Sequence, residues 1–288
     1  MKISDFAELE NKIANDANFS TIGHLHGKGE KRLVPINSEQ DFQYAVLSET
    51  IAGFIIPMTI LLPIDTEKGL LISPNPLKTA LFIQKEMYQK SGESKKPTKI
   101  HPSASIHPTA IISENDVSIG KKVQIYEHVI IHEGSIIEDN SIIGPNTLIG
   151  SIPQSDDSDQ SLKEYHPFGS VHIKQDVVIH ANCCIEKPWF QDTTIIGKRC
   201  HIDNLVTIRQ GAVVNDCSLI TANSEIGEYS TIGKNCWIGL RATIHPGVNI
   251  GDSCYVTLGS RVTKNIGPGM VVKDNWAIKR ERFKGIIT

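Results

Sequence analysis

A six-residue rhythm of aliphatic residues constrains this chain more than any other feature. Isoleucine or valine recurs every sixth position from Ile100 to Val262, interrupted by a polar excursion at 151–170 and by a short insertion, PWFQDTT, at 188–194. A period of six fits neither a helix nor a simple alternating strand. It predicts short strands joined by tight corners, with the aliphatic anchors stacked inside. We count 24 such hexads, which make eight coils if three hexads form one turn.

A second column of residues supports this register. Four positions after most anchors stands a small or β-branched residue, as at Val206, Ala212 and Ser218, and glycine often follows the anchor directly. Cys236 and Cys254 occupy this inward column, where free cysteine packs as a small hydrophobic residue. None of the six cysteines forms a C-x-x-C pair. We therefore interpret all six as structural rather than as metal or redox sites.

The first 98 residues lack the repeat and predict a small α/β domain. Residues 45–63 indicate a helix followed by a strand, and residues 69–91 indicate a strand, a proline turn and an amphipathic helix. The segment at 91–99, SGESKKPTK, has the composition of a linker. The expected organisation is thus an α/β domain at 1–98, a candidate for nucleotide binding, a β-helix at 99–272 and a tail at 273–288.

Charge and hydropathy narrow the possible partners and the compartment. The formal net charge is −3, and lysine and arginine are scattered rather than gathered into a stripe, so no nucleic-acid partner is expected. Residues 1–20 show no signal-peptide pattern, and the apolar run Phe54–Leu62 is too short to span a membrane. We expect a cytoplasmic protein with reduced thiols and no membrane span.

The repeats resemble those of the hexapeptide-repeat acyltransferases. The run NCWIGLRATIHPGVNIGDSCYVTLGSRVTKNIGPGMVV, at 235–272, is very similar to the coenzyme A-binding coils of that superfamily. The resemblance implies a mainly β fold, a left-handed parallel β-helix preceded by the α/β domain. Periodicity alone does not fix the hand, and ordinary crossovers are right-handed. A rod with flat faces and sites between coils also predicts a closed homotrimer.

A closer resemblance covers nearly the whole chain. ISPNPLKTALF, IHPSASIHPTAII and TIIGKRCHIDNLVTI are similar to segments of the UDP-3-O-acylglucosamine N-acyltransferases of lipid A synthesis, and the excursion falls where that family has one. The resemblance places the family's Asp-Asn pair at Asp203 and Asn204. Two departures oppose lipid A synthesis itself: the family's catalytic histidine is replaced by Gln210, and the chain ends soon after the last coil. Both favour a relative that moves a short acyl group from coenzyme A to a nucleotide-linked amino sugar for cell-surface polysaccharide or lipopolysaccharide.

Acyl transfer from a thioester to an amine requires a proton acceptor and an oxyanion donor, but no metal. If the insertion loops out, His180 and Asp203 lie above one another in successive coils at about 4.8 Å. A carboxylate there would orient the imidazole and raise its basicity, so His180 is the candidate base; a simple surface role is the alternative. His201 is a second candidate. Gln210 would hold the sugar or a water, because its amide cannot act as a base.

Further candidates concern the donor and the acceptor. Coils bordering the pantetheine arm of acetyl-coenzyme A, or of another short acyl-coenzyme A, are expected to contribute Trp237, Gly239, Ala242 and Lys264, with Lys279 and Arg280 as a basic end. The nucleotide-linked amino sugar is assigned Phe42 and Tyr44 for stacking on a base, and His166 on the excursion. A core role for the aromatic pair and a solvated basic end are the alternatives.

Three other functions stay open at this point. The first is a lipid A-type N-acyltransferase that uses acyl-carrier protein. The second is a metalloprotein resembling the γ-class carbonic anhydrases, which needs three histidines around zinc at a subunit boundary. The third is a non-catalytic β-helix scaffold, which the loss of the histidine at Gln210 would permit.

Overall fold

The computed structural model describes residues 1–6, 12–60, 66–92, 94–153, 165–274 and 276–279, which divide into two compact units. The first unit comprises Met1–Ser94, Ser155–His166 and Trp189–Asp192; the second comprises Lys95–Gln154, Pro167–Pro188 and Thr193–Thr288.

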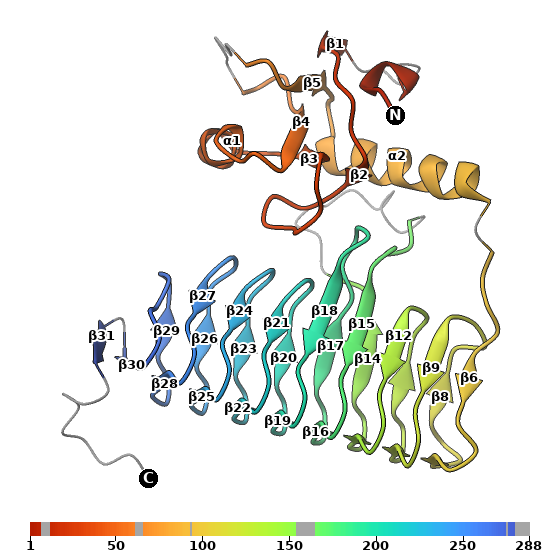
Figure 1. The fold of residues 1–288 in the computed structure, drawn as a ribbon, viewed down its shortest axis with the longest axis vertical. Coiled ribbons are helices and arrows are strands. Elements are labelled where there is room, and N and C mark those ends of the chain that lie inside the picture. The colour runs from red at the N-terminus through yellow and green to blue at the C-terminus, as the bar shows by residue number, and fades with distance from the viewer. Residues whose placement is uncertain (7–11, 61–65, 93, 154–164, 275, 280–288) are drawn as a thin grey trace. The chain divides into compact units, whose positions relative to one another are not determined.

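The second unit is a left-handed parallel β-helix whose coils build three sheets (Figure 1). Sheet A contains β7 (Ser105–Ile106), β10 (Gln124–Ile125), β13 (Ile142–Ile143), β16 (Val178–Ile179), β19 (His201–Ile202), β22 (Leu219–Ile220), β25 (Trp237–Ile238), β28 (Tyr255–Val256), β30 (Met270–Lys273) and β31 (Trp276–Lys279). Sheet B contains β8 (Ile111–Ile112), β11 (Ile130–Ile131), β14 (Leu148–Ser151), β17 (Cys184–Glu186), β20 (Thr207–Ile208), β23 (Glu225–Ile226), β26 (Thr243–Ile244) and β29 (Arg261–Val262). Sheet C contains β6 (Lys99–Ile100), β9 (Val117–Ile119), β12 (Ser135–Ile137), β15 (Ser170–Ile173), β18 (Thr193–Ile196), β21 (Val213–Val214), β24 (Thr231–Ile232) and β27 (Asn249–Ile250).

The predicted hexads correspond one to one with the strands β6 to β29, so the prediction of eight coils is confirmed. Each strand pairs in parallel with the strand one coil later, as Ile179 does with Ile202 and Ile202 with Ile220. From the second coil onward the anchors are buried and form one continuous core. The second column also points inward, since Val206, Ala212 and the other small residues of that column are buried.

Left-handed backbone conformations produce the corners of the coils. The third residue after most anchors has a positive φ, including the asparagines Asn140, Asn146 and Asn182, at 56–60°. Asparagine tolerates this region better than most L-residues, which explains its repeated use here. The glycine that directly follows an anchor has another cause. A β-carbon on Gly239 would stand 2.6 Å from the backbone nitrogen of Leu258 in the next coil. Close stacking of the coils therefore excludes a side chain there.

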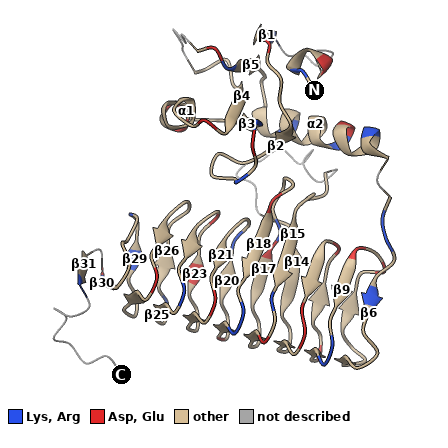
Figure 2. Cartoon of the chain, viewed as in Figure 1, with Lys and Arg blue, Asp and Glu red and all other residues tan. Residues whose placement is uncertain are grey.

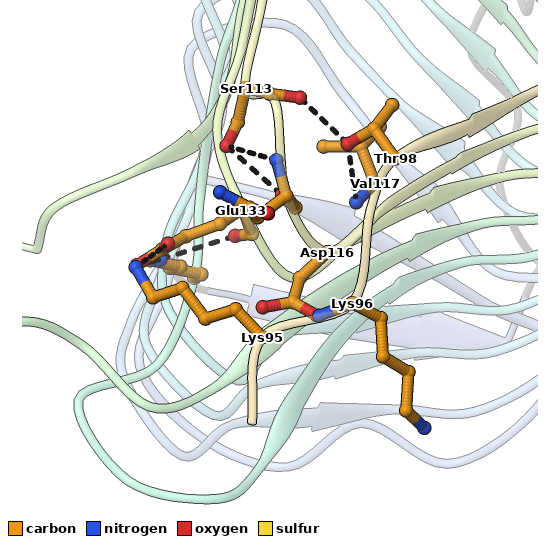
Figure 3. A network of polar contacts seen from close by, with 9 residues as sticks. Lys95, Lys96, Thr98, Ser113, Asp116, Val117 and Glu133 are labelled. Carbon is orange, nitrogen blue, oxygen red and sulfur yellow. Dashed lines mark hydrogen bonds and ion pairs between the residues drawn. The ribbon is translucent and has the colours of Figure 1, made fainter. Parts of the chain in front are cut away.

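The start of the β-helix is held by polar contacts, and Figure 3 shows them from close by. Lys96 donates its backbone N–H to Oδ1 of Asp116 at 2.8 Å, and Thr98 donates its hydroxyl to the carbonyl of Ser113 at 2.7 Å. Lys95 forms an ion pair with Glu133 at 2.5 Å. The predicted linker at 91–99 is therefore wrong at its C-terminal end, because the chain is fixed from Lys95 onward.

The first unit is a five-stranded sheet with helices. Its strands lie in the order β1 (Lys12–Asn15), β5 (Gly69–Ile72), β4 (Ile51–Ile56), β3 (Arg32–Pro35) and β2 (Thr21–Ile22), with only β1 antiparallel to its neighbour. The helices are η1 (Ile3–Phe6), α1 (Glu39–Val46) and α2 (Pro76–Ser91). Asn75 caps α2 and Gly92 ends it in a left-handed conformation. The strand predicted within 45–63 and the strand, turn and helix predicted within 69–91 are confirmed. The helix predicted at the start of 45–63 is wrong, because α1 lies before that range and overlaps it only at Ala45 and Val46.

Residues from the insertion complete the core of the first unit. Trp189 and Phe190 are buried in the same cluster as Phe6, Phe19 and Leu81, and Tyr165 packs against it. The insertion PWFQDTT therefore supplies apolar side chains to a sheet built almost entirely from residues 1–94.

Charged residues of both signs are interspersed along the corners of the coils (Figure 2). No helix within the described ranges is long and apolar enough to cross a membrane.

Candidate active site

The A–B corner, where the chain passes from sheet A to sheet B, contains His180, Asp203 and Asn204. His180 follows β16 and Asp203 follows β19, and the backbone N–H of His180 donates to the carbonyl of Ile202 at 2.8 Å. The predicted stacking of these two positions is therefore confirmed. It depends on the insertion leaving the coil, which it does between β17, which ends at Glu186, and β18, which begins at Thr193 and includes the last two residues of the insertion.

The side chains at this corner do not form the expected imidazole–carboxylate pair. Oδ1 of Asp203 accepts from the backbone N–H of Asn204 at 2.7 Å and from its side-chain amide at 2.8 Å. Oδ1 of Asn204 accepts in turn from the backbone N–H of Ala181 at 3.1 Å. His180 is exposed, and within the described residues no hydrogen bond joins its ring to Asp203. The Asp-Asn pair braces the corner backbone instead.

The outer face of sheet A bears a column of side chains in register. It comprises Val178, His201, Leu219, Trp237 and Tyr255. The rings of Trp237 and Tyr255 are stacked, with centroids 6.0 Å apart and an interplanar angle of 22°. Trp237 is 38% exposed. The pair therefore presents a flat aromatic surface to solvent, with His201 two positions further along the same column.

The remaining donor candidates are spread over the last coils. Ala242 is fully buried and its side chain packs in the core, whereas Lys264 and Lys279 are exposed. Arg280 lies outside the described residues.

The acceptor candidates lie in the first unit. Phe42 is buried and packs edge-on against Phe54, with ring centroids 5.0 Å apart. Tyr44 is 60% exposed, and its ring centroid lies 5.5 Å from that of His26. The two residues thus face different surroundings, so only Tyr44 presents its ring to solvent. His166 is exposed, while residues 154–164 of the excursion lie outside the described ranges.

Gln210 lies at a different corner from His180 and Asp203. It follows β20, at the B–C corner where the chain leaves sheet B for sheet C, and it is buried. Its backbone N–H donates to Oε2 of Glu186 at 3.1 Å. The structure therefore separates Gln210 from the Asp-Asn pair within one chain and groups it with a carboxylate.

Glu186, Arg209 and Glu228 form a charged group at this B–C corner. Nε of Arg209 lies 3.4 Å from Oε2 of Glu186, and a terminal nitrogen of Arg209 donates to Oε1 of Glu228 at 3.2 Å. Burial raises the pKa of Glu186 to about 7, although Arg209 and the Gln210 amide act to lower it. A carboxyl group that titrates near neutral pH can exchange protons during a reaction.

Sequence reasoning missed this group, although the signal was present. Glu186 and Arg209 each follow an anchor by one residue, as His180 and Asp203 do. The register that stacks His180 over Asp203 also stacks Glu186 over Arg209, one hexad further along. Within the described part of the chain, no group of three or more histidine, cysteine, aspartate or glutamate side chains is arranged to hold a metal ion.

Comparisons with known proteins agree with the fold. Residues 116–151 match the model of the bacterial transferase hexapeptide (six repeats), and residues 230–264 match that of the hexapeptide repeat of succinyl-transferase. A UDP-N-acetylglucosamine acyltransferase from Campylobacter jejuni is 23% identical, with 65% of this chain and 79% of that one aligned and a TM-score of 0.52. The UDP-N-acetylglucosamine O-acyltransferase of Moraxella catarrhalis is 23% identical over 60% of this chain and 70% of that one, with a TM-score of 0.40. A search of curated protein sequences finds no match.

The chain therefore has the left-handed β-helix fold and carries transferase-type hexapeptide repeats in two segments, residues 116–151 and 230–264.

Proposed function

We propose that the protein is an N-acyltransferase that moves an acetyl or other short acyl group from coenzyme A to the amine of a nucleotide-linked amino sugar. The observation that carries this proposal is the array of eight coils whose repeats match transferase hexapeptides in two separate segments. The product would serve cell-surface polysaccharide or lipopolysaccharide synthesis, and the active form would be a homotrimer.

The outer face of sheet A supports the choice of donor. Coenzyme A presents an adenine ring, phosphates and a thin pantetheine arm. The stacked Trp237–Tyr255 pair is a flat surface suited to an aromatic ring or the arm. Lys264 is exposed after the last coil and is a candidate for a phosphate of the donor.

The choice of a nucleotide-linked amino sugar as acceptor rests on the resemblance to the UDP-3-O-acylglucosamine N-acyltransferases and on the α/β sheet of the first unit. A nucleotide-linked sugar combines an aromatic base, a diphosphate and a sugar, and a small α/β sheet is a common platform for nucleotides. Tyr44 is the exposed aromatic side chain that we assign to the base. The Campylobacter jejuni neighbour is described as an acyltransferase of UDP-N-acetylglucosamine, which is a sugar of this chemical class.

The reaction itself needs few groups. The neutral amine attacks the thioester carbonyl, a C–N bond forms, and the C–S bond breaks. The amine loses a proton and the coenzyme A thiolate gains one. A thiol has an ordinary pKa of about 8.5, so it is a tolerable leaving group. A backbone N–H at a corner is sufficient as the oxyanion donor.

A matrix of donors and acceptors tests the proposal. Acetyl-coenzyme A, longer acyl-coenzyme A thioesters and acyl-carrier protein would each be offered with a panel of nucleotide-linked amino sugars, and thiol release and product mass would be measured. We expect turnover with a short acyl-coenzyme A and one amino sugar. Turnover only with acyl-carrier protein would favour a lipid A-type enzyme, and failure of every pair would refute the proposed function.

A further inference from the structure

Glu186 is a carboxylate in an unusual place. Of the aspartates and glutamates that the structure describes, it alone is buried, with its side chain 7% exposed. It does not belong to the apolar core, because its predecessor Ile185 is the inward anchor of that hexad. Its side chain lies instead at the B–C corner, outside the core. A buried carboxylate costs stability unless it is paired.

One oxygen of this carboxylate is held by two donors. Oε2 accepts the backbone N–H of Gln210 at 3.1 Å and lies 3.4 Å from Nε of Arg209. Arg209 is itself shared with Glu228. Oε1 of Glu186 accepts no hydrogen bond from any residue that the structure describes. The carboxylate is therefore oriented through one oxygen, and the other is left for a further partner.

The position in the coils is also distinctive. Both interruptions of the repeat leave sheet B beside this residue: the polar excursion follows β14, which ends at Ser151, and the insertion follows β17, which ends at Glu186. Ser151 and Glu186 are partners in the sheet. Next to them, the hydroxyl of Ser151 and the thiol of Cys184 lie 3.1 Å apart. Glu186 thus stands where the regular wall of the β-helix is broken by two long loops.

The charges that face Glu186 are of both signs. Arg209 favours the ionised carboxylate, whereas the carboxylates of Glu228 and Glu225 oppose it. Burial has the largest effect, and it places the pKa of Glu186 at about 7. A general base is most effective when its pKa lies near the working pH.

We propose that Glu186 is the proton acceptor of the acyl transfer, a role that rests on the function and the homotrimer proposed above. The B–C corner lies opposite sheet A within one coil, so the donor that reaches Glu186 is one bound on sheet A of a neighbouring subunit. As the amine nitrogen forms its bond to the thioester carbon, the amine proton passes to Oε1 of Glu186 and the C–S bond breaks. The same proton then protonates the departing thiolate, so the carboxylate is restored. Arg209 and the Gln210 peptide position the carboxylate through Oε2. His180 has no such support, because Asp203 is committed to Asn204.

The test compares four variants of the full-length protein with the wild type: Glu186→Gln, Glu186→Asp, His180→Ala and, as a control, Glu127→Gln. Glu127 is a carboxylate at a corner of an early coil, and its side chain makes no hydrogen bond to any residue the structure describes. Glu186→Gln keeps the size of the side chain, and we expect it to lower kcat by about 10²–10⁴-fold, the usual worth of a positioned base. It should also abolish the acidic limb of the pH–kcat profile near pH 7. Glu186→Asp should recover part of the rate.

The outcomes separate this inference from the proposed function. If the wild type transfers acyl groups and Glu186→Gln keeps both its rate and its pH profile, the role of Glu186 is refuted while the acyltransferase stands. Loss of activity in His180→Ala with retention in Glu186→Gln would assign the base to His180 instead. If Glu186→Gln is slow but its pH profile is unchanged, the residue is structural and the inference is wrong. If the wild type is inactive with every donor and acceptor, the proposed function is refuted, and so is the role of Glu186.

Discussion

The buried carboxylate at the B–C corner should make the stability of the protein depend on pH in a direction opposite to that of most acidic side chains. Burial raises the pKa of Glu186 from an ordinary value of 4.5 to about 7 in the folded protein. The folded chain therefore holds its proton over a range in which the unfolded chain has released it. The stabilising contribution is complete below about pH 4.5 and is lost as the pH rises through about 7.

The size of the effect follows from the two pKa values. One pKa unit corresponds to about 1.4 kcal/mol, so the full effect is about 3 kcal/mol. Between pH 5 and pH 8 the folded state loses about 2–3 kcal/mol relative to the unfolded state from this group alone. Glu186→Gln removes the titration and keeps the shape of the side chain. The difference in unfolding free energy between variant and wild type should then shift by about 2–3 kcal/mol in favour of the variant over this range.

Urea denaturation followed by far-ultraviolet circular dichroism would measure this shift. Protein concentration must be equal in all samples, because subunit association contributes to the apparent stability. Glu127→Gln is the matched control and should follow the wild type at both pH values. Parallel pH dependence of Glu186→Gln and the wild type would refute a raised pKa for the Glu186 carboxyl group, whatever the outcome of the activity assays.

Two further predictions concern the coils and their assembly. Gly239→Ala should lower the free energy of unfolding by about 1–3 kcal/mol, because its β-carbon would stand 2.6 Å from a backbone nitrogen of the next coil; Gly267→Ala, where nothing lies within 4 Å, should change it by less than about 0.5 kcal/mol. Equal effects in urea denaturation would contradict the stacking argument. Light scattering coupled to size exclusion should give about three times the chain mass of 31.7 kDa, and a stable monomer would contradict the trimer.

Much of the fold could be predicted because the repeat is a local pattern with a global consequence. The six-residue period fixes the position of each anchor, such as Ile202. The stacking of the coils in register follows from the same period. Asn182 and similar corner residues add a second local signal, because few residue types tolerate the left-handed conformation. The hand of the coil came from the resemblance, since the period is the same for either hand.

The site was less accessible to sequence reasoning. Register correctly placed His180 over Asp203, but the rotamer of Asp203 depends on Asn204, which competes for the same oxygen. Glu186 was not singled out, because burial decides its chemistry and a sequence does not display the burial of a corner side chain. The packing of Trp189 and Phe190 could not be predicted for a related reason. In the sequence, an insertion resembles a surface loop even when its apolar residues pack against a distant part of the chain.

The packing of Trp189 and Phe190 in the core of the first unit determines when that unit can complete its folding during synthesis. The sheet of the first unit is encoded by residues 1–94, yet Trp189 and Phe190, which complete its core, emerge from the ribosome only after the first four coils. Until then the nascent sheet exposes the surface that these two rings will cover, and exposed apolar surface is what makes partly folded chains aggregate. The first unit is therefore synthesised first, but its folding is completed only after the fourth coil has been made. A fragment that ends at residue 94 would leave this apolar surface exposed.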